Sequence, residues 1–302
     1  MSHKYRGNKG GDLSLKLPKT LRGDILIIGG GPAGMAAAIS AKRSNSKIDV
    51  VLIEKNEIMG RKLRATGNGR CNITNVNAEG YSEVISFLSS LGIVTKINEN
   101  GFLYPASESA ADVSELLELR LKQLGVKVYT GVTALEVSYA SDKTEFLTTV
   151  SMRETSDHGG SADYLKCTVY SSALVIAAGG KSAPVYGSTG EGYRWLRGLG
   201  HTVTRLVPSL APIECDGADL SKLSGTRVRA EAKLFKNGEE IHREDGEIQF
   251  TKFGLSGICI FNLSKMMRFE PGDTFSSFEI VLDLCREIDL GDVLKCAAER
   301  TG

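Results

Sequence analysis

Three glycines, Gly29, Gly31 and Gly34, have the Gly-x-Gly-x-x-Gly spacing of a dinucleotide-binding fingerprint, and an acidic residue, Glu54, follows them along the chain. In such a motif the glycines let the backbone turn tightly and approach a pyrophosphate. The acidic side chain accepts hydrogen bonds from ribose hydroxyls, which favours a ribose without a 2′-phosphate. The spacing therefore predicts a site for FAD or NAD and does not separate the two.

The segments around these glycines suit that role. The apolar run at residues 25–28 predicts a strand buried on both faces. Pro32 fits the first position of a helix, and the mostly apolar segment at residues 48–53 predicts a second strand that ends at Glu54. The resulting βαβ unit would place Pro32 and Ala33 at a helix N-terminus, where the helix dipole attracts phosphate.

A second glycine-rich stretch, RKLRATGNGRCNITN at residues 61–75, combines basic side chains with one cysteine. It lacks the Gly-Lys-Ser/Thr ending of an ATP-binding loop, so it indicates a different kind of contact. Arg61 and Lys62 could pair with phosphate oxygens or remain a solvated basic pair after a turn. Asn72 suits a ligand contact or the stabilisation of the turn itself.

Cys71 is the candidate catalytic residue of this stretch. A thiol beside Arg70 should have a lowered pKa and could donate a proton to a substrate. Free cysteines also pack as small apolar residues, and the sequence leaves both hypotheses open.

The remaining pattern divides the chain. Up to about residue 207 it mixes helical and strand-like segments, and beyond that point polar and apolar residues alternate as in antiparallel strands. We expect a disordered basic tail at residues 1–22, a first domain at residues 23–207 and a β-rich second domain at residues 208–302. The expected elements are a helix at 111–124, strands at 126–129, 134–137, 172–180, 226–235 and 275–284, a surface loop at 153–163, and hairpin turns at Asn237-Gly238 and Asp245-Gly246.

Composition excludes several classes of protein. The chain has 302 residues, of which 41% are hydrophobic and 24% are charged, as is usual for a globular protein. Its net charge of +1 gives no strong electrostatic field of the kind that attracts nucleic acid or a membrane. No apolar run has the length of a membrane span or a signal peptide, and the six cysteines form no Cys-x-x-Cys pair. These features favour a cytoplasmic protein without a metal site. The basic tail at residues 1–22 fits solvated chain or contact with RNA.

Five stretches occur in an order typical of one family: GGGPAG, GRKLRATGNGRCNITN, GFLYPAS, AAGGKSAPVYGSTGEGY and GEIQFTKFGLSG. Through them the chain resembles the HI0933-like, or BaiN-like, family of NAD(P)/FAD-dependent oxidoreductases. The resemblance implies an α/β fold in which a two-dinucleotide-binding-like FAD domain, starting with a Rossmann-type βαβ unit, is interrupted by a β-rich inserted domain.

The resemblance also implies roles for residues. The fingerprint glycines would meet the FAD pyrophosphate, Glu54 the adenosine ribose and a backbone group of Val132 the adenine. The residues expected at the cofactor are Gly29, Gly31, Pro32, Ala33, Gly34, Glu54, Lys55, Arg61, Lys62, Gly67, Arg70, Cys71, Asn72, Val132, Gly179 and Gly180.

A flavoprotein of this kind transfers a hydride through flavin N5, with NAD(P)H as a candidate transient donor. The substrate would be a small molecule or RNA, because family members are linked to steroid-like ketones, small amines and a uracil base of ribosomal RNA. Members also continue beyond the position that matches Gly302, so we expect this chain to hold FAD weakly or to need that further segment. A flavin-binding or interaction protein without catalysis is the third alternative.

Overall fold

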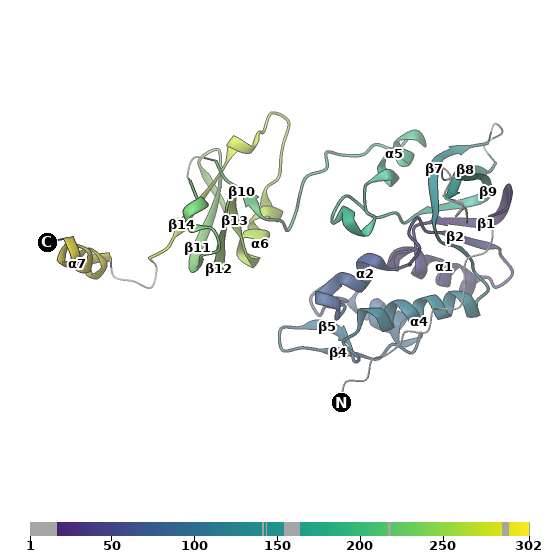
Figure 1. The fold of residues 1–302 in the computed structure, drawn as a ribbon, viewed down its shortest axis with the longest axis horizontal. Coiled ribbons are helices and arrows are strands. Elements are labelled where there is room, and N and C mark those ends of the chain that lie inside the picture. The colour runs from purple at the N-terminus through teal and green to yellow at the C-terminus, as the bar shows by residue number, and fades with distance from the viewer. Residues whose placement is uncertain are drawn as a thin grey trace, which may run out of the picture. The chain divides into compact units, whose positions relative to one another are not determined.

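The computed structural model describes residues 17–140, 142, 144–153, 164–216, 219–285 and 290–301, and the chain divides into two compact units, Met1–Val203 and Thr204–Gly302 (Figure 1). The first unit contains β1 (Thr20–Ile28), α1 (Pro32–Ser44), β2 (Val50–Ile53), α2 (Arg61–Ala65), η1 (Thr66–Gly69), β3 (Thr74–Asn75), α3 (Tyr81–Ser89), β4 (Thr95–Ile97), β5 (Phe102–Pro105), α4 (Ala110–Gln123), β6 (Lys127–Tyr129), β7 (Val132–Tyr139), β8 (Phe146–Arg153), β9 (Tyr164–Ile176), η2 (Pro184–Tyr186) and α5 (Glu191–Gly198). The second contains β10 (Ile213–Glu214), η3 (Ser221–Leu223), β11 (Arg227–Lys236), β12 (Glu239–Thr251), β13 (Gly254–Ser256), α6 (Ile258–Met266), η4 (Phe275–Ser277), β14 (Phe278–Asp283) and α7 (Leu290–Thr301).

The main sheet of the first unit has the order β6-β2-β1-β9-β8-β7 within the described residues. Its parallel strands β6, β2, β1 and β9 follow the Rossmann arrangement, in which the chain moves outward from β1 on one side and later returns to its other side. Strands β8 and β7 extend this sheet in antiparallel pairing. A small antiparallel sheet, β3-β5-β4, lies outside the main one.

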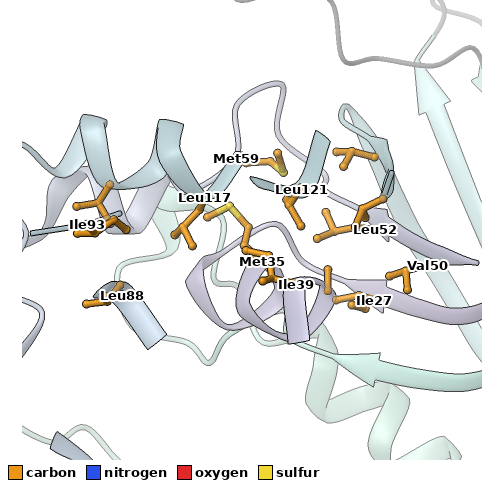
Figure 2. Packing of buried hydrophobic residues seen from close by; sticks show 14 of the residues in the cluster. Ile27, Met35, Ile39, Val50, Leu52, Met59, Leu88, Ile93, Leu117 and Leu121 are labelled. Atoms are coloured by element: carbon orange, nitrogen blue, oxygen red, sulfur yellow. The ribbon is translucent and has the colours of Figure 1, made fainter. Parts of the chain in front are cut away.

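Strand β2 and the last residues of β1, from Leu26 to Ile28, are buried on both faces, as their consecutive apolar residues predict. Ile27 and Leu52 face a hydrophobic cluster shared with Met35 and Ile39 of α1 and with Leu117 of α4 (Figure 2). The small residues of α1 allow this helix to lie close to the strands and to α4. The predicted βαβ unit is therefore confirmed.

The opposite face of the same strands has its own core. Leu26 and Ile53 pack there with Val150 of β8, Val169 of β9 and Trp195 of α5. Residues of β8, β9 and α5 thus build a second core on the face of the sheet opposite α1 and α4. The parallel strands lie between the two cores.

The second unit is built on an antiparallel sheet of order β10-β13-β12-β11-β14 within the described residues. Leu234, Ile248 and Ile260 form its fully buried centre, with α6 packed on the long strands β11 and β12. The α/β region followed by a β-rich region agrees with the predicted fold class.

Two sequence-based predictions about elements are wrong. The basic tail was expected to reach residue 22, but residues 20–22 belong to β1 and pair with β9, and Leu17 is buried in the adjoining core. Asp245-Gly246 forms no hairpin, because β12 continues through it and pairs with Glu231 and Ala230 of β11. Neither Asp245 nor Gly246 has the positive φ that a tight hairpin requires. Asn237 and Gly238 do have positive φ angles, of 52° and 85°, and form the turn that connects β11 to β12.

The surface loop predicted at residues 153–163 lies, apart from Arg153 at the end of β8, outside the described residues. Among the helices that the structure describes, none has the length and apolar character needed to cross a membrane.

Candidate functional site

The first unit contains a cavity of about 250 Å³ at the carboxyl ends of β1, β2 and β9. This place follows from the strand order, because the chain reverses direction across the sheet between β1 and β9 and leaves a crevice there. The cavity is lined by Ile28, Gly29, Gly31, Pro32, Ala33, Ile53, Glu54, Lys55, Asn56, Gly60, Arg61, Lys62, Val132, Thr133, Ala134, Ala177, Ala178, Gly179, Tyr186, Gly187, Ser188, Glu191 and Trp195.

The three fingerprint glycines meet three different steric demands. Gly29 has a φ of 113°, and a Cβ there would lie 2.5 Å from the carbonyl oxygen of Ala177. A Cβ on Gly34 would lie 1.9 Å from the carbonyl oxygen of Gly29, so only glycine lets α1 approach β1 this closely. A Cβ on Gly31 would meet nothing within 4 Å, since this glycine borders the cavity itself.

The N-terminus of α1 opens on this cavity. Gly31 is its N-cap residue, no side chain caps the helix, and no acidic residue stands in the first turn. Pro32 and Ala33, the next two residues, also line the cavity. Free helix N–H groups and the positive end of the dipole make this position favourable for an anionic group such as a phosphate.

Glu54 places a buried carboxylate on the same wall, and the residue is only 8% exposed. Its Oε2 accepts a 2.7 Å hydrogen bond from the Gly30 N–H, and its Oε1 accepts bonds from the backbone and side-chain N–H groups of Asn56. A carboxylate has about four acceptor positions, so it retains capacity for a ribose hydroxyl.

Lys55 and Lys62 reach across the cavity to the segment that follows β9. The Lys55 ammonium bonds the Glu191 carboxylate at 2.8 Å and the Thr189 hydroxyl at 2.9 Å. Lys62 donates to the carbonyl oxygen of Ser182 at 2.7 Å. Burial acts to raise the pKa of Glu191, but the bonds from Lys55 and Thr189 outweigh it and hold that pKa below its ordinary value. These lysines join two walls of the cavity, a role that the sequence did not suggest.

Arg61 begins α2 and lines the cavity as well. Its Nη1 donates to the side-chain oxygen of Asn56 at 2.7 Å, a bond that uses one of the five N–H donors of the guanidinium. The cavity wall therefore carries three cationic side chains and two carboxylates, with a helix N-terminus in addition.

Val132 lines the cavity at the start of β7, and its N–H donates to the Glu54 carbonyl at 2.9 Å. A contact between Val132 and a base would thus use its other atoms. Gly179 also lines the cavity, with a φ of 73° that brings it against Ser188. Gly180 is not among the lining residues, and a Cβ added to it would lie 3.0 Å from the hydroxyl oxygen of Tyr193.

The loop at residues 66–72 lies apart from the cavity lining. Gly67, Asn68 and Gly69 all have positive φ angles, so this segment is a succession of tight turns. Arg70 donates from Nε to the Gly67 carbonyl and lies over the ring of Tyr104, 5.3 Å from its centroid. Of the predicted cofactor residues, Gly34, Gly67, Arg70, Cys71, Asn72 and Gly180 do not line the cavity.

Cys71 is buried in the hydrophobic cluster beneath α1 and is 1% exposed. Burial raises the pKa of its thiol, although a hydrogen bond with Thr66 acts in the opposite direction. The lowered pKa expected from Arg70 is therefore wrong, because the guanidinium lies over Tyr104 and loss of solvent dominates around the thiol. Cys71 also has a φ of 65°, a left-handed conformation that is uncommon for a residue with a side chain.

The sequence did not indicate several of the residues that line the cavity. Asn56 and Gly60 follow Glu54 closely along the chain, and their position just after β2 was the available signal. Ser188, Glu191 and Trp195 come from a segment more than a hundred residues away, and no local pattern links them to Glu54. Trp195 packs in the core of the second face of the sheet and contributes to the cavity wall at the same time.

The fold agrees with the comparison to known families. The HI0933-like protein Rossmann domain matches residues 23–82 and 79–248, and the HI0933-like protein barrel and H2TH domain matches residues 207–299. This chain belongs to the HI0933-like family. Membership confirms the resemblance that the sequence motifs indicate.

Two curated relatives show the range of this family. A 3-dehydro-bile acid delta(4,6)-reductase of Clostridium scindens is 35% identical over 260 residues, which are 80% of this chain and 59% of the relative. A ribosomal RNA dihydrouridine synthase of Escherichia coli is 27% identical over 292 residues, 90% of this chain and 67% of the relative. This chain thus spans about three fifths to two thirds of the lengths of these relatives.

Among solved structures, THI4 of Thermovibrio ammonificans aligns with 52% of this chain and 58% of its own, at 18% identity and a TM-score of 0.39.

Proposed function

We propose that this chain binds FAD in the cavity of the first unit and acts as an FAD-dependent oxidoreductase. The observation that carries the proposal is the uncapped N-terminus of α1, which opens on the cavity beside the buried carboxylate of Glu54. A free helix N-terminus stabilises a pyrophosphate, and the carboxylate can accept a hydrogen bond from the hydroxyl of an unphosphorylated ribose.

The residues present fit such a dinucleotide. Gly31 leaves open space where any other residue would place a Cβ, which is what a close backbone approach to phosphate requires. Glu54 would accept a hydrogen bond from a ribose hydroxyl. Arg61 would lie near phosphate oxygens, to which a guanidinium forms strong hydrogen bonds. When bound, FAD supplies hydride transfer at flavin N5, and the chain supplies orientation and exclusion of water.

The first test separates FAD from simpler flavins. FMN contains the reactive ring but lacks the adenosine and the second phosphate that the cavity would hold. We therefore expect titrations monitored by flavin fluorescence to give much tighter binding of FAD than of FMN, and ADP to compete with FAD. Equal affinities for the two flavins, or no competition by ADP, would refute the proposed site.

The second test concerns the electron donor and the substrate, for which NAD(P)H and a small ketone or related molecule are our first proposal. The relative with the higher identity is named as a bile acid reductase. Loss of the flavin absorbance band under anaerobic NADH or NADPH, followed by its return when an unsaturated ketone is added, would support this proposal. A chain that binds FAD but is reduced by neither nucleotide would favour a flavin-binding or interaction protein without catalysis.

A uracil base of ribosomal RNA is the second candidate substrate, because the similarity to the dihydrouridine synthase extends over 90% of this chain. Basic residues at 1–16 would supply phosphate contacts. RNA binding with steep salt dependence, reduced by deletion of residues 1–16, would support this candidate. The deletion stops there because Leu17 is buried and β1 begins at Thr20. In either case we propose that the protein acts in the cytoplasm.

A further inference from the structure

Asn56 occupies an unusual position in the wall of the cavity, where all of its polar groups are bonded at once. Its backbone N–H and its side-chain amide N–H both donate to Glu54 Oε1. Its side-chain oxygen accepts from Arg61 Nη1 at 2.7 Å, and its backbone carbonyl accepts from the Gly131 N–H at 3.1 Å. Asn56 therefore links β2, α2 and the turn before β7.

The amide of Asn56 satisfies both side-chain partners at once. Glu54 requires a donor, and Arg61 requires an acceptor. Aspartate would accept from Arg61 but would set a second carboxylate against Glu54, and alanine would lose both bonds. The two partners also fix which end of the amide carries the nitrogen.

The bonds of Asn56 connect the two ends of the proposed binding surface. The Gly30 N–H holds Oε2 of Glu54 at 2.7 Å, Asn56 holds Oε1, and Asn56 then holds Arg61. A carboxylate and a guanidinium are thereby fixed relative to each other and to the turn before α1. Preorganised partners of this kind bind a ligand without first losing side-chain entropy.

We propose that Asn56 is a positioning residue of the dinucleotide site, which orients Glu54 toward the ribose and Arg61 toward the pyrophosphate. The inference rests on the proposed function, since it assumes that an adenine dinucleotide occupies this cavity. Asn56 acts through its two neighbours, so its contribution to affinity falls when one of the neighbours that it orients is removed.

Tight packing gives Asn56 a structural role as well, and the test must distinguish the two. A Cβ added to Gly187 would lie 2.8 Å from Nδ2 of Asn56, so the amide packs closely against the segment that follows β9. A purely structural role would lower stability and weaken every ligand alike. A positioning role would make the losses at Asn56 and Arg61 depend on each other.

The experiment is a double-mutant cycle in the full chain, with ADP as the probe and calorimetric titration as the readout. Asn56→Ala should weaken ADP binding about tenfold, since it removes a bond to a charged group on each side. The same substitution made in an Arg61→Met chain should cost only about threefold, because Arg61 is absent and only the orientation of Glu54 is left to lose. Additive losses would overturn the assignment.

A second variant covers the case in which Asn56→Ala does not fold. Asn56→Asp keeps the shape and the acceptor for Arg61 but repels Glu54, so it should weaken binding of adenosine, which has a ribose and no phosphate. The matched control is Asn98→Ala, because Asn98 caps the β4–β5 turn through bonds from the N–H groups of Asn100 and Phe102 and lies away from the cavity. An equal loss of ADP affinity in Asn98→Ala, or unchanged adenosine binding in Asn56→Asp, would overturn the inference. Absence of ADP binding by the unmodified chain would refute the proposed function itself, whereas normal binding with additive losses refutes only the role of Asn56.

Discussion

The two glycine-rich segments of the first unit look alike in sequence and differ in structure. Around Gly31 the backbone borders a cavity, the helix N-terminus is uncapped, and a carboxylate stands alongside. In the loop at residues 66–72 the glycines provide positive φ angles, and Cys71, the candidate catalytic residue, lies in a hydrophobic cluster.

The difference shows that glycine serves two separate purposes. In the fingerprint, glycine creates space for something outside the chain or permits close packing within it. In the loop, glycine permits backbone conformations that other residues reach only with strain. Both segments are rich in glycine, so the surroundings decide whether such a segment binds a ligand.

The strongest effect should come from Gly34, where the fingerprint packs most tightly. Gly34→Ala would force a methyl group to within 1.9 Å of the Gly29 carbonyl, and we expect it to lower the free energy of unfolding by about 3 kcal/mol. Urea denaturation followed by circular dichroism measures this change. Gly69→Ala is the matched substitution in the loop, where a Cβ meets nothing within 4 Å and only the φ of 85° is unfavourable. It should cost about 1 kcal/mol, and an equal cost for both variants would remove the proposed distinction.

Glu54 tests the ligand side of the comparison. Glu54→Gln keeps the shape but replaces an acceptor carboxylate with an amide that is a poor partner for the Gly30 and Asn56 N–H groups. We expect ADP affinity to fall about tenfold, equivalent to about 1.4 kcal/mol. Unchanged ADP affinity would show that the ribose does not reach this wall. Arg70→Gln, in the loop, should leave ADP affinity within about twofold of the unmodified chain.

Cys71 tests whether the loop is a packing element. Cys71→Ala should lower the free energy of unfolding by about 1 kcal/mol and leave FAD binding unchanged. Because the folded-state pKa of the thiol is raised above its ordinary value of 9.0, its contribution to stability is complete below pH 9.0 and is lost as the pH rises through the folded-state pKa. The difference in unfolding free energy between the two proteins should therefore shrink above pH 9.0. Loss of turnover with normal FAD content would instead support catalysis by this thiol.

The smallest effect should come from the lysine that joins the two walls of the cavity at the Ser182 carbonyl. Lys62→Met removes one exposed hydrogen bond, and we expect a loss of at most about 1 kcal/mol in unfolding free energy, measured by urea denaturation. If ADP affinity also falls more than about tenfold, Lys62 contacts phosphate directly, as the sequence first suggested.

The sequence predicted those parts of the fold and site that depend on local patterns. Residues 25–34 carry a strand, a turn and a helix start in one continuous signal, and Glu54 stands at a fixed distance from it. Asp245-Gly246 misled because its pairing with β11 outweighs the turn preference of the two residues. Local propensity yields to tertiary pairing in such strands.

The remaining features depend on contacts between distant segments. Glu191 meets Lys55 only after β9 has returned to lie beside β1, so no short pattern announces the pair. The pKa of Cys71 was misjudged for a related reason, because sequence shows the neighbouring Arg70 but not the burial that surrounds the thiol. Burial depends on the whole fold, whereas adjacency along the chain does not.

The central claim is that the space beside Gly31 receives the phosphates of FAD, and the affinity of Gly31→Ala for FAD tests it most directly. Gly31 has φ and ψ angles of −77° and 178°, which alanine adopts without strain, and nothing in the protein lies within 4 Å of the added methyl group. We predict unchanged stability and FAD binding at least about tenfold weaker than in the unmodified chain and in Gly69→Ala. Unchanged FAD affinity in Gly31→Ala would contradict the account.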